Sequence, residues 1–444
     1  MNRVFVANRG EIALRIVEAC QKLGLETVVG CSDVDRDGAA ARAADRAITI
    51  GPGPARDSYL RDDLVVQAAL GTGCDAVHPG YGFLSESPKL AERARLHGLT
   101  FVGPETDTIK LSGDKLRARA EAALAGLPVL PGEQCHSPEQ ARDAADRIGF
   151  PVLVKAAGGG GGRGIKLARD ANELSSLLSL AGSEAAAAFG DERLYVERLV
   201  ANARHVEVQI AADAGGEVVH LGERDCSVQR RYQKVVEEAT APGLADDTRD
   251  ALRTAAVTYA RAIGYRNLGT VEFVLDGDSG QFSFLEINCR IQVEHPVTEA
   301  VTGCDLVAMQ LQIADGEPLA FSQDEVHFDG HAVECRLNAE DVAHGFVPTP
   351  GTLSLFSVPE RRGLRVDTHC EAGAVVPPYY DSLLGKLIAH APDRDGAIDL
   401  LLEVLEEVDV EGVETNRTLL ISVLGHRDFR AGPVSTDWLE RAIV

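Results

Sequence analysis

Three oxygen-bearing side chains occur on one predicted β-hairpin, at a spacing that could hold a divalent cation. The hairpin covers residues 269–288, with Glu272 in its first strand and Glu286 and Asn288 in its second. If the turn centres near Ser279, Glu272 lies across from Glu286, and Asn288 shares the face of Glu286 because side chains alternate along a strand. Facing carboxylates repel unless a cation separates them, and Mg²⁺ prefers such ligands together with nucleotide phosphates. Exposed acids on a two-sided hairpin are the alternative, but the neighbouring Phe, Val, Leu and Ile residues favour burial.

A run of glycines at residues 158–164 lies between two predicted strands, one reaching Lys155 and the next covering 165–168. A Walker loop is excluded, because that motif needs Gly-Lys-Ser/Thr at the start of a helix. Glycines between strands can instead form a flap whose bare amides close over phosphates. Lys115 and Lys155 would add positive charge there. A flexible surface linker is the alternative, although linkers usually mix Gly with Ser away from strand ends.

Two polar segments could bind an anion. Residues 290–296 combine Arg290, an amide and Glu294 in a stretch too polar for a core strand. The guanidinium could hold an oxyanion while Glu294 removes a proton from a nucleophile. Residues 229–238 place three cations ahead of two acids, and this run fits either a solvated charged strand or the lining of an anion site.

The first part of the chain alternates strand and helix, which predicts a parallel sheet. The turn after the first strand, Asn8-Arg9-Gly10, lacks the glycine pattern of dinucleotide-binding folds, so a nicotinamide site is disfavoured. We expect an open α/β domain over residues 1–113. Its expected strands are 4–7, 27–30, 76–77 and 100–102, and its expected helices are 11–23, 61–70 and 88–97.

The middle of the chain favours β-structure. The segments 194–197, 205–211 and 217–221 alternate, and we expect them to form hairpins, the last two joined by a turn at 213–216. Boundaries are expected near 114 and 330, which gives units 1–113, 114–329 (with a lid at about 131–203) and a mixed α/β unit 330–444. Further helices are expected at 138–147, 247–263, 395–407 and 416–424.

Composition excludes several classes of protein. The 444 residues carry a formal net charge of −24 and few aromatics, which argues against nucleic acid as a partner. Nine cysteines without a C-x-x-C pair indicate reduced thiols in a cytoplasmic protein. The N-terminus lacks the features of a signal peptide, and no apolar run is long enough for a membrane span.

Taken in this order, the motifs resemble the biotin carboxylase family of the ATP-grasp superfamily almost from end to end. The resemblance implies a multidomain α/β and α+β fold: an N-terminal parallel-sheet (pre-ATP-grasp) domain, an ATP-grasp domain with a glycine-rich lid, and a mixed C-terminal biotin carboxylase domain. The motifs that carry it are 7–13 (ANRGEIA), 78–86 (HPGYGFLSE), 113–115 (GDK), the glycine run, 223–227 (ERDCS), 290–296 (RIQVEHP), 333–341 (VECRLNAED) and 377–382 (PPYYDS).

The resemblance also implies a role for individual residues. Glu272, Glu286 and Asn288 would hold Mg²⁺ or Mn²⁺. Bicarbonate and biotin would contact Lys234, Arg290, Gln292, the Val293 backbone, Glu294, Arg336 and Tyr81. ATP would contact Lys115, Lys155, Gly160, Gly161, Gly162, Arg163, Gly164, Glu197, Arg198, Leu199, Val200, His205, Gln229, Tyr232, Glu272 and Glu286.

The implied reaction phosphorylates bicarbonate with ATP. Glu294 would deprotonate bicarbonate for attack on the γ-phosphorus, with Lys234 and Arg290 as its catalytic partners, and the carboxyphosphate would collapse to CO₂ and phosphate in a closed site. The phosphate would take the ureido proton of biotin, and Arg336 would stabilise the resulting enolate. This agrees with the physics, because developing charge needs fixed cations where water is excluded. A lone surface arginine is the alternative for Arg336, but the alternation of residues 333–336 directs it inward.

The carrier of biotin is expected to be another chain, since neither methionine flanks a lysine. The resemblance is to the separate subunit of acetyl-CoA carboxylase, which supplies malonyl-CoA for fatty acid synthesis, or of a related acyl-CoA carboxylase. A carboxyltransferase and a homodimer are implied as partners. Three positions depart from the family pattern and leave nucleotide affinity and the choice of substrate open: Arg198, Tyr232 and Cys289.

Two other functions remain open. An ATP-grasp ligase could activate a different carboxylic acid and join it to an amine, in which case ADP release would depend on that acid and not on bicarbonate. A nucleotide-binding regulatory subunit could keep the fold without turnover. Against the latter, the chain retains Lys234, Glu294 and Arg336, and buried charges of this kind are costly without a function.

Overall fold

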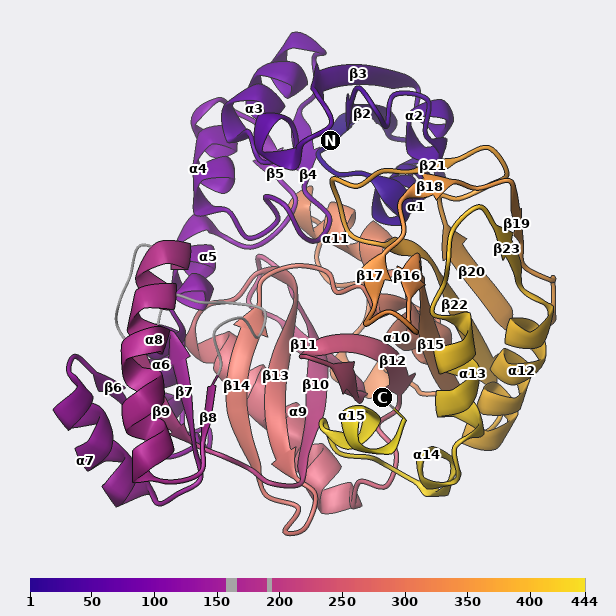
Figure 1. The fold of residues 1–444 in the computed structure, drawn as a ribbon. Coiled ribbons are helices and arrows are strands. Elements are labelled where there is room, and N and C mark those ends of the chain that lie inside the picture. The colour runs from indigo at the N-terminus through magenta and orange to yellow at the C-terminus, as the bar shows by residue number, and fades with distance from the viewer. Residues whose placement is uncertain (157–165, 190–193, 444) are drawn as a thin grey trace.

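The computed structural model describes residues 1–156, 166–189 and 194–443 (Figure 1). An N-terminal sheet of five parallel strands has the order β3-β2-β1-β4-β5, which confirms the predicted open α/β domain. Val4 and Val6 belong to the core on the side of helix α1, whereas Phe5 belongs to the opposite core, as alternation along a buried strand requires. The elements are β1 (Arg3–Val6), α1 (Gly10–Lys22), β2 (Glu26–Ser32), α2 (Ala39–Ala43), β3 (Arg46–Gly51), α3 (Asp62–Gly71), β4 (Ala76–His78), α4 (Pro88–Leu96), β5 (Thr100–Phe101) and α5 (Thr106–Gly113).

A second, four-stranded antiparallel sheet has the order β6-β9-β7-β8 and packs against α7 and α8 (Figure 1). We expected the segments 194–197, 205–211 and 217–221 to form hairpins with one another. This prediction is wrong for the segment 194–197. That segment, β9, pairs with β6 and β7, because its Val196 packs in the alanine-rich core beneath α7. The elements are α6 (Lys115–Leu124), β6 (Gly132–Cys135), α7 (Pro138–Ile148), β7 (Val152–Ala156), β8 (Lys166–Ala168), α8 (Ala171–Phe189) and β9 (Leu194–Arg198).

An eight-stranded antiparallel sheet forms the centre of the molecule, in the order β14-β13-β10-β11-β12-β15-β22-β20. The sheet is continuous across residues 329 and 330, because β12 pairs with β15 and places Val236 opposite Cys335. The predicted turn at 213–216 joins β10 and β11 as expected. The elements are β10 (Ala203–Ala212), β11 (Val218–Arg230), β12 (Gln233–Ala239), α9 (Asp246–Ala262), β13 (Asn267–Asp276), β14 (Phe282–Asn288), β15 (His331–Asn338), β20 (Leu364–Thr368) and β22 (Leu383–Ala391).

The remaining elements cover this sheet and complete the C-terminal part, where α12 and α13 lie at the right of Figure 1. They are α10 (His295–Thr302), α11 (Leu306–Ala314), β16 (Glu340–Asp341), β17 (Val347–Pro348), β18 (Gly351–Thr352), β19 (Leu355–Ser357), β21 (Val375–Val376), α12 (Arg394–Glu407), β23 (Asp409–Glu411), α13 (Arg417–Gly425), α14 (Arg427–Ala431) and α15 (Trp438–Ala442). In the described part of the chain, no helix combines the length and the apolar character needed to cross a membrane. All nine cysteines are free thiols.

One face of the central sheet is apolar and the other carries charge. On β10, Val206 and Val208 enter the core beneath α9, so Glu207 between them lies on the opposite face. The register sets Glu207 opposite both Glu272 of β13 and Arg224 of β11. The same face continues to the far edge through the cross-strand pairs Glu237 with Glu334, Arg336 with Lys386, and Lys386 with Asp367. Alternation thus gathers charges from distant parts of the sequence on one surface.

Truncation of the apolar face tests this arrangement. Phe273 is fully buried and packs edge-on against Phe282, with ring centroids 5.4 Å apart. Phe273→Ala should cost about 3–5 kcal/mol of stability, because it leaves a cavity in the core. Thermal unfolding followed by circular dichroism measures the loss as a lower midpoint. Leu124→Ala, at a residue that is 82% exposed, is the control and should leave the midpoint unchanged. Equal midpoints for both variants would contradict the assigned core.

Candidate active site

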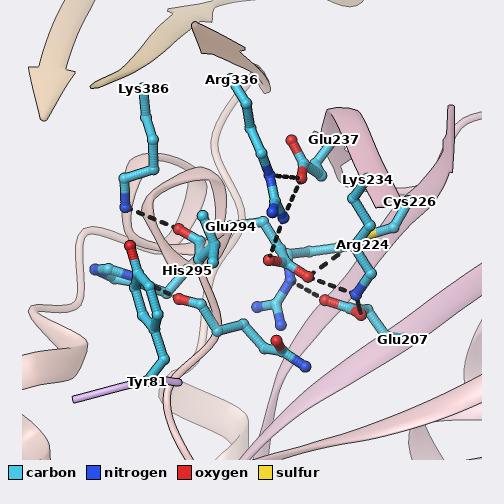
Figure 2. A network of polar contacts seen from close by, with 12 residues as sticks. Tyr81, Glu207, Arg224, Cys226, Lys234, Glu237, Glu294, His295, Arg336 and Lys386 are labelled. Carbon is cyan, nitrogen blue, oxygen red and sulfur yellow. Dashed lines mark hydrogen bonds and ion pairs between the residues drawn. The ribbon is translucent and has the colours of Figure 1, made fainter. Parts of the chain in front are cut away.

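The centre of the site is a buried carboxylate, Glu294, held between two cations (Figure 2). Its Oε1 accepts a hydrogen bond from Lys234 Nζ at 2.6 Å, and its Oε2 accepts one from Arg336 Nη2 at 2.9 Å. Each cation also binds a second buried acid: Lys234 donates to Glu207 at 2.6 Å, and Arg336 donates to Glu237 at 2.6 Å. Acids and cations therefore alternate across the charged face of the sheet.

Arg224 organises one end of this network, and sequence reasoning assigned it no role. Its side chain is fully buried and donates to Glu207 at 2.7 Å, to Gln209 at 2.8 Å, to Thr298 at 2.9 Å and to Thr270 at 3.1 Å. One sequence signal could have indicated this role. Polar residues alternate with valines on β10, so they form a buried charged face whose acids require a cation nearby. Because Arg224 also balances the charge of Glu207, Lys234 can serve Glu294 as well as Glu207.

The network fixes the ionisation of its members. Burial raises the pKa of Glu294, but the charges of Lys234 and Arg336 outweigh burial and hold that pKa well below its usual range. Burial lowers the pKa of Lys234, but the surrounding glutamates raise it well above its usual value. Burial also raises the pKa of Glu237, to about 7, although Arg336 opposes that shift. Glu294 and Lys234 are therefore both charged at neutral pH.

Glu272, predicted to be a metal ligand, lies at the centre of a second set of polar contacts. Its carboxylate contacts His205 at 3.0 Å and Lys234 at 3.2 Å, and accepts hydrogen bonds from Asn288 at 2.7 Å and Gln292 at 3.2 Å. Burial raises the pKa of Glu272, but Lys234 and His205 lower it far more, so it remains ionised. Burial lowers the pKa of His205, and Glu272 reverses that effect to give a net increase.

The predicted pairing of Glu272 with Glu286 is confirmed, because the register of β13 and β14 sets them opposite each other. Glu286 forms an ion pair of 2.8 Å with Lys115, which begins α6 directly after the capping residue Asp114. Each carboxylate is thus balanced by a protein cation, and these acidic oxygens suit a divalent ion. Asn288 differs from expectation in one respect: its Oδ1 accepts from Arg290 at 3.1 Å, so a metal would share this oxygen with the guanidinium. A second possible ligand set is His205, Glu207 and Glu272.

Arg290 is directed toward the same oxygen-rich region. Its guanidinium donates to Glu86 at 3.0 Å and to Gln292 at 2.7 Å, besides Asn288. Glu86 belongs to the segment 78–86, so Arg290 links the N-terminal unit to the charged face of the central sheet. The structure therefore brings Lys234, Arg290 and Arg336 together around the segment that carries Glu294.

The residues predicted to contact ATP are described in part. Lys155 forms an ion pair with Glu197, and Arg119 lies 3.8 Å from the same carboxylate. The backbone amides of Arg198 and Leu199 donate hydrogen bonds to the carbonyls of Pro131 and Pro151. These bonds attach the segment that leads to Val200 to the four-stranded sheet. Gln229 Nε2 lies 2.8 Å from His205 Nδ1. The predicted flap residues Gly160, Gly161, Gly162, Arg163 and Gly164 lie outside the described residues.

The charged run 229–238 divides into a buried part and an exposed part. It forms a hairpin of β11 and β12, whose strand residues Gln229, Lys234 and Glu237 face the site. Tyr232, at the tip, is 52% exposed. The exposed tip therefore fits the solvated interpretation, and the buried strand residues are the part that could line an anion site.

Tyr81 lies beside a cavity of about 140 Å³ whose lining also includes Glu11, Phe83, Asp381 and Leu383. Its hydroxyl donates a hydrogen bond to Glu11. The lining comes from the N-terminal unit, from His369 directly after β20, and from Asp381 and Leu383 at the start of β22. Tyr81 therefore lies where the N-terminal unit meets the C-terminal part of the chain.

Models of known families match three successive parts of the chain. Residues 1–109 match the biotin carboxylase N-terminal domain, residues 114–322 match the carbamoyl-phosphate synthase L chain ATP-binding domain, and residues 334–441 match the biotin carboxylase C-terminal domain. The fold and the site thus define a protein of the ATP-grasp class.

Relatives give the narrower assignment. The chain is 44% identical to biotin carboxylase 1 of Bacillus subtilis over 99% of this chain and 98% of the relative. It is 46% identical to the biotin carboxylase of Pseudomonas aeruginosa over 100% and 99%. The chain belongs to the biotin carboxylase family.

Two solved structures agree with this assignment. The biotin carboxylase domain dimer of the 2-oxoglutarate carboxylase of Hydrogenobacter thermophilus, in complex with MgADP, ADP and bicarbonate, has a TM-score of 0.96 at 43% identity, covering 99% of this chain and 97% of that chain. A biotin carboxylase complex from Campylobacter jejuni has a TM-score of 0.96 at 39% identity, covering 99% and 98%.

Removal of the central ammonium tests the electrostatics of the site. In Lys234→Met, Glu207, Glu272 and Glu294 lose a shared counter-charge, so we expect at least one of them to take up a proton at neutral pH. Infrared spectroscopy should show an additional band of protonated carboxyl groups. Lys110→Met is the control, because Lys110 is exposed and pairs with the surface residue Asp107, outside this network. Identical spectra for wild type and Lys234→Met would contradict the charge balance described here.

Proposed function

We propose that the protein is a biotin carboxylase, an ADP-forming ligase that uses ATP and bicarbonate to carboxylate biotin held on a carrier protein. The observation that carries this proposal is the position of Glu294, in contact with both Lys234 and Arg336. One carboxylate thus contacts the cation expected to bind bicarbonate and the cation expected to bind biotin. Bicarbonate and biotin would meet at Glu294.

The geometry gives Glu294 a way to act as a base. While Lys234 and Arg336 both contact Glu294, the pKa of this carboxylate is too low for efficient proton abstraction. We propose that bicarbonate binds to Lys234, Arg290, Gln292 and the Val293 amide. The bound anion would draw the ammonium group of Lys234 toward itself. The pKa of Glu294 would then rise, because a like charge has arrived and part of the counter-charge has moved. Binding of the substrate would thereby activate its own base.

The nucleotide would use cations that now balance acids. Lys115 pairs with Glu286, so a phosphate group could recruit this lysine once a divalent cation takes its place there. Lys155 pairs with Glu197 and could turn to a phosphate group while Arg119, 3.8 Å away, balances that acid. Glu272, Glu286 and Asn288 would hold Mg²⁺ or Mn²⁺, which would neutralise charge on the transferred phosphoryl group. Glu197, Arg198, Leu199, Val200, His205 and Gln229 would line the nucleotide, with Tyr232 at the outer rim, and the residues of the glycine run would complete the phosphate site.

Biotin would enter beside Tyr81 and reach Arg336. The guanidinium already binds two carboxylates, Glu237 and Glu294, so it can exchange one of them for the negatively charged oxygen of a biotin enolate. The carboxyphosphate formed from bicarbonate would release CO₂ and phosphate next to that oxygen. Little water would compete, because Glu237 and Glu294 have almost no exposed surface.

The partners follow from the same proposal. A separate biotin carboxyl carrier protein would present the cofactor, and a carboxyltransferase would pass the carboxyl group to acetyl-CoA or a related acyl-CoA in the cytoplasm. A homodimer is proposed on the similarity to the dimer from Hydrogenobacter thermophilus. We also propose the three units 1–113, 114–329 and 330–444, with a lid at about 131–203.

The Glu294→Gln variant tests the proposed base. Bicarbonate-dependent ADP release should fall about 100-fold or more, since a general base contributes on that scale, while ATP binding persists. A coupled assay for ADP and a fluorescent nucleotide analogue measure the two quantities. Glu217→Gln, at an exposed residue between β10 and β11, is the control. Full activity in Glu294→Gln would contradict the assignment, and wild-type ADP release that needs another carboxylic acid would overturn the proposed function.

The Glu272→Gln variant tests the proposed metal site. The neutral side chain loses the charge that holds a divalent ion, so the Mg²⁺ concentration for half-maximal activity should rise about tenfold. Titration of ADP release with Mg²⁺ at fixed ATP measures the shift. Asp276→Asn, at the end of the same strand, is the matched control and should not change it. An unchanged Mg²⁺ requirement in Glu272→Gln would remove this residue from the metal site.

A further inference from the structure

A second buried cation, Lys386 on β22, holds the segment of Glu294 from the side away from Lys234 in the view of Figure 2. Its side chain has no exposed surface, and its Nζ donates to the backbone carbonyl of Val293 at 2.8 Å. Val293 immediately precedes Glu294. Lys386 is also the cross-strand neighbour of Arg336, so both cations that flank Glu294 on this side are set by the pairing of β15 with β22.

Three buried acids face this single ammonium. Nζ lies 3.4 Å from Glu11 and 3.7 Å from Asp367, and Glu334 acts on it from the adjacent strand. Arg365 neutralises Asp367 through two hydrogen bonds of 2.7 Å and 2.8 Å. Lys386 is therefore the direct counter-charge of Glu11, and it acts on Glu334 together with Arg336.

One of those two acids, Glu334, favours the protonated form. Among the described residues, neither of its carboxyl oxygens has a hydrogen-bond partner, and Glu237 lies directly opposite it on β12. Burial raises the pKa of Glu334 well above its usual value. Glu334 is therefore the neutral acid, and the charge of Lys386 is available to Glu11.

Glu11 connects this ammonium to the cavity beside Tyr81. The Tyr81 hydroxyl donates to Glu11, and both residues line the cavity of about 140 Å³. A continuous path of contacts thus runs from the cavity through Tyr81, Glu11 and Lys386 to the Val293 carbonyl. Each of the three side chains between its ends makes contacts on two sides.

We propose that Lys386 is a positioning residue that fixes the Val293–Glu294 peptide and, through Glu11 and Tyr81, couples the cavity to the anion site. The proposal rests on the proposed function, in which bicarbonate binds the Val293 amide and biotin enters beside Tyr81. Because Lys386 holds the carbonyl of the same residue, it sets where that amide and the following carboxylate lie. Displacement of about 1 Å at such a point can cost on the order of 100-fold in rate.

The coupling should depend on pH. Burial raises the pKa of Glu11 to about 7; Lys386 lowers this pKa, and Asp367 and Asp381 raise it. Above pH 7 Glu11 is ionised, attracts Lys386 and accepts the Tyr81 hydrogen bond. Below pH 7 it becomes neutral, and the path loses its central ion pair. With free biotin as the substrate, kcat/KM for biotin should therefore fall as pH drops through about 7.

Steady-state kinetics of Lys386→Met test the positioning role. We expect the KM for bicarbonate to rise about 10- to 100-fold while the KM for ATP changes less than about twofold, because only the anion site loses its support. Lys386→Arg retains the charge and should recover part of the loss. If Lys386→Met does not fold, the double variant Lys386→Met with Glu11→Gln restores the charge balance and should show the same selective rise.

The matched control is Arg394→Met. Arg394 also forms an ion pair with a buried acid, Glu238, at 2.6 Å. Within the ranges that the structure describes, its hydrogen bonds go to Glu238 and to the Arg430 carbonyl, away from residues 290–294. It should lower thermal stability without changing the KM for bicarbonate. Glu11→Gln should weaken the step near pH 7 in the biotin profile, and any step that stays would belong to Glu237, whose pKa is also raised to about 7. Unchanged KM values in Lys386→Met, or an unaltered pH profile in Glu11→Gln, would overturn the inference. Absence of bicarbonate-dependent ADP release in the wild type would overturn the proposed function instead.

Discussion

The site depends on the balance of charge around Glu294. A carboxylate that is 1% exposed can remain ionised only where cations repay its lost hydration, and Lys234 and Arg336 do so through direct hydrogen bonds. Each cation is in turn oriented by another acid, Glu207 or Glu237. The acids and cations of the network already balance each other without a ligand. An anion that binds there must therefore draw a cation away from one of these acids. That redistribution links binding to catalysis.

The central sheet makes this balance possible. Antiparallel pairing sets side chains from eight strands on one face, and the apolar cores on the other face fix the register that brings them together. A shift of one residue in β15 would turn Arg336 into the core and expose Cys335 to the charged face. The stability of the fold and the chemistry of the site therefore depend on the same pairings.

Part of this arrangement could be predicted from the sequence. The alternation on both sides of the turn at 276–280 predicted the pairing of Glu272 with Glu286. The register next to the turn sets Leu275 opposite Phe282, so this pair is reached only through a β-bulge between Glu272 and Phe273, which the sequence pattern did not indicate. The charges on Arg224 and Lys386 were visible, but their partners come from strands and helices far apart in the chain, and local patterns carry no record of such contacts. The position of β9 in a different sheet was not predicted for the same reason, because the alternation of a short segment does not reveal which strands it pairs with.

A double-mutant cycle on Lys234 and Glu294 tests the central claim most directly. The quantity measured is kcat/KM for bicarbonate in the wild type, Lys234→Met, Glu294→Gln and the double variant. If the two side chains act as one charged unit, the double variant should lose about as much as the more damaging single variant. If the two losses multiply, the side chains act independently, and a site built on the shared charge of Glu294 is contradicted.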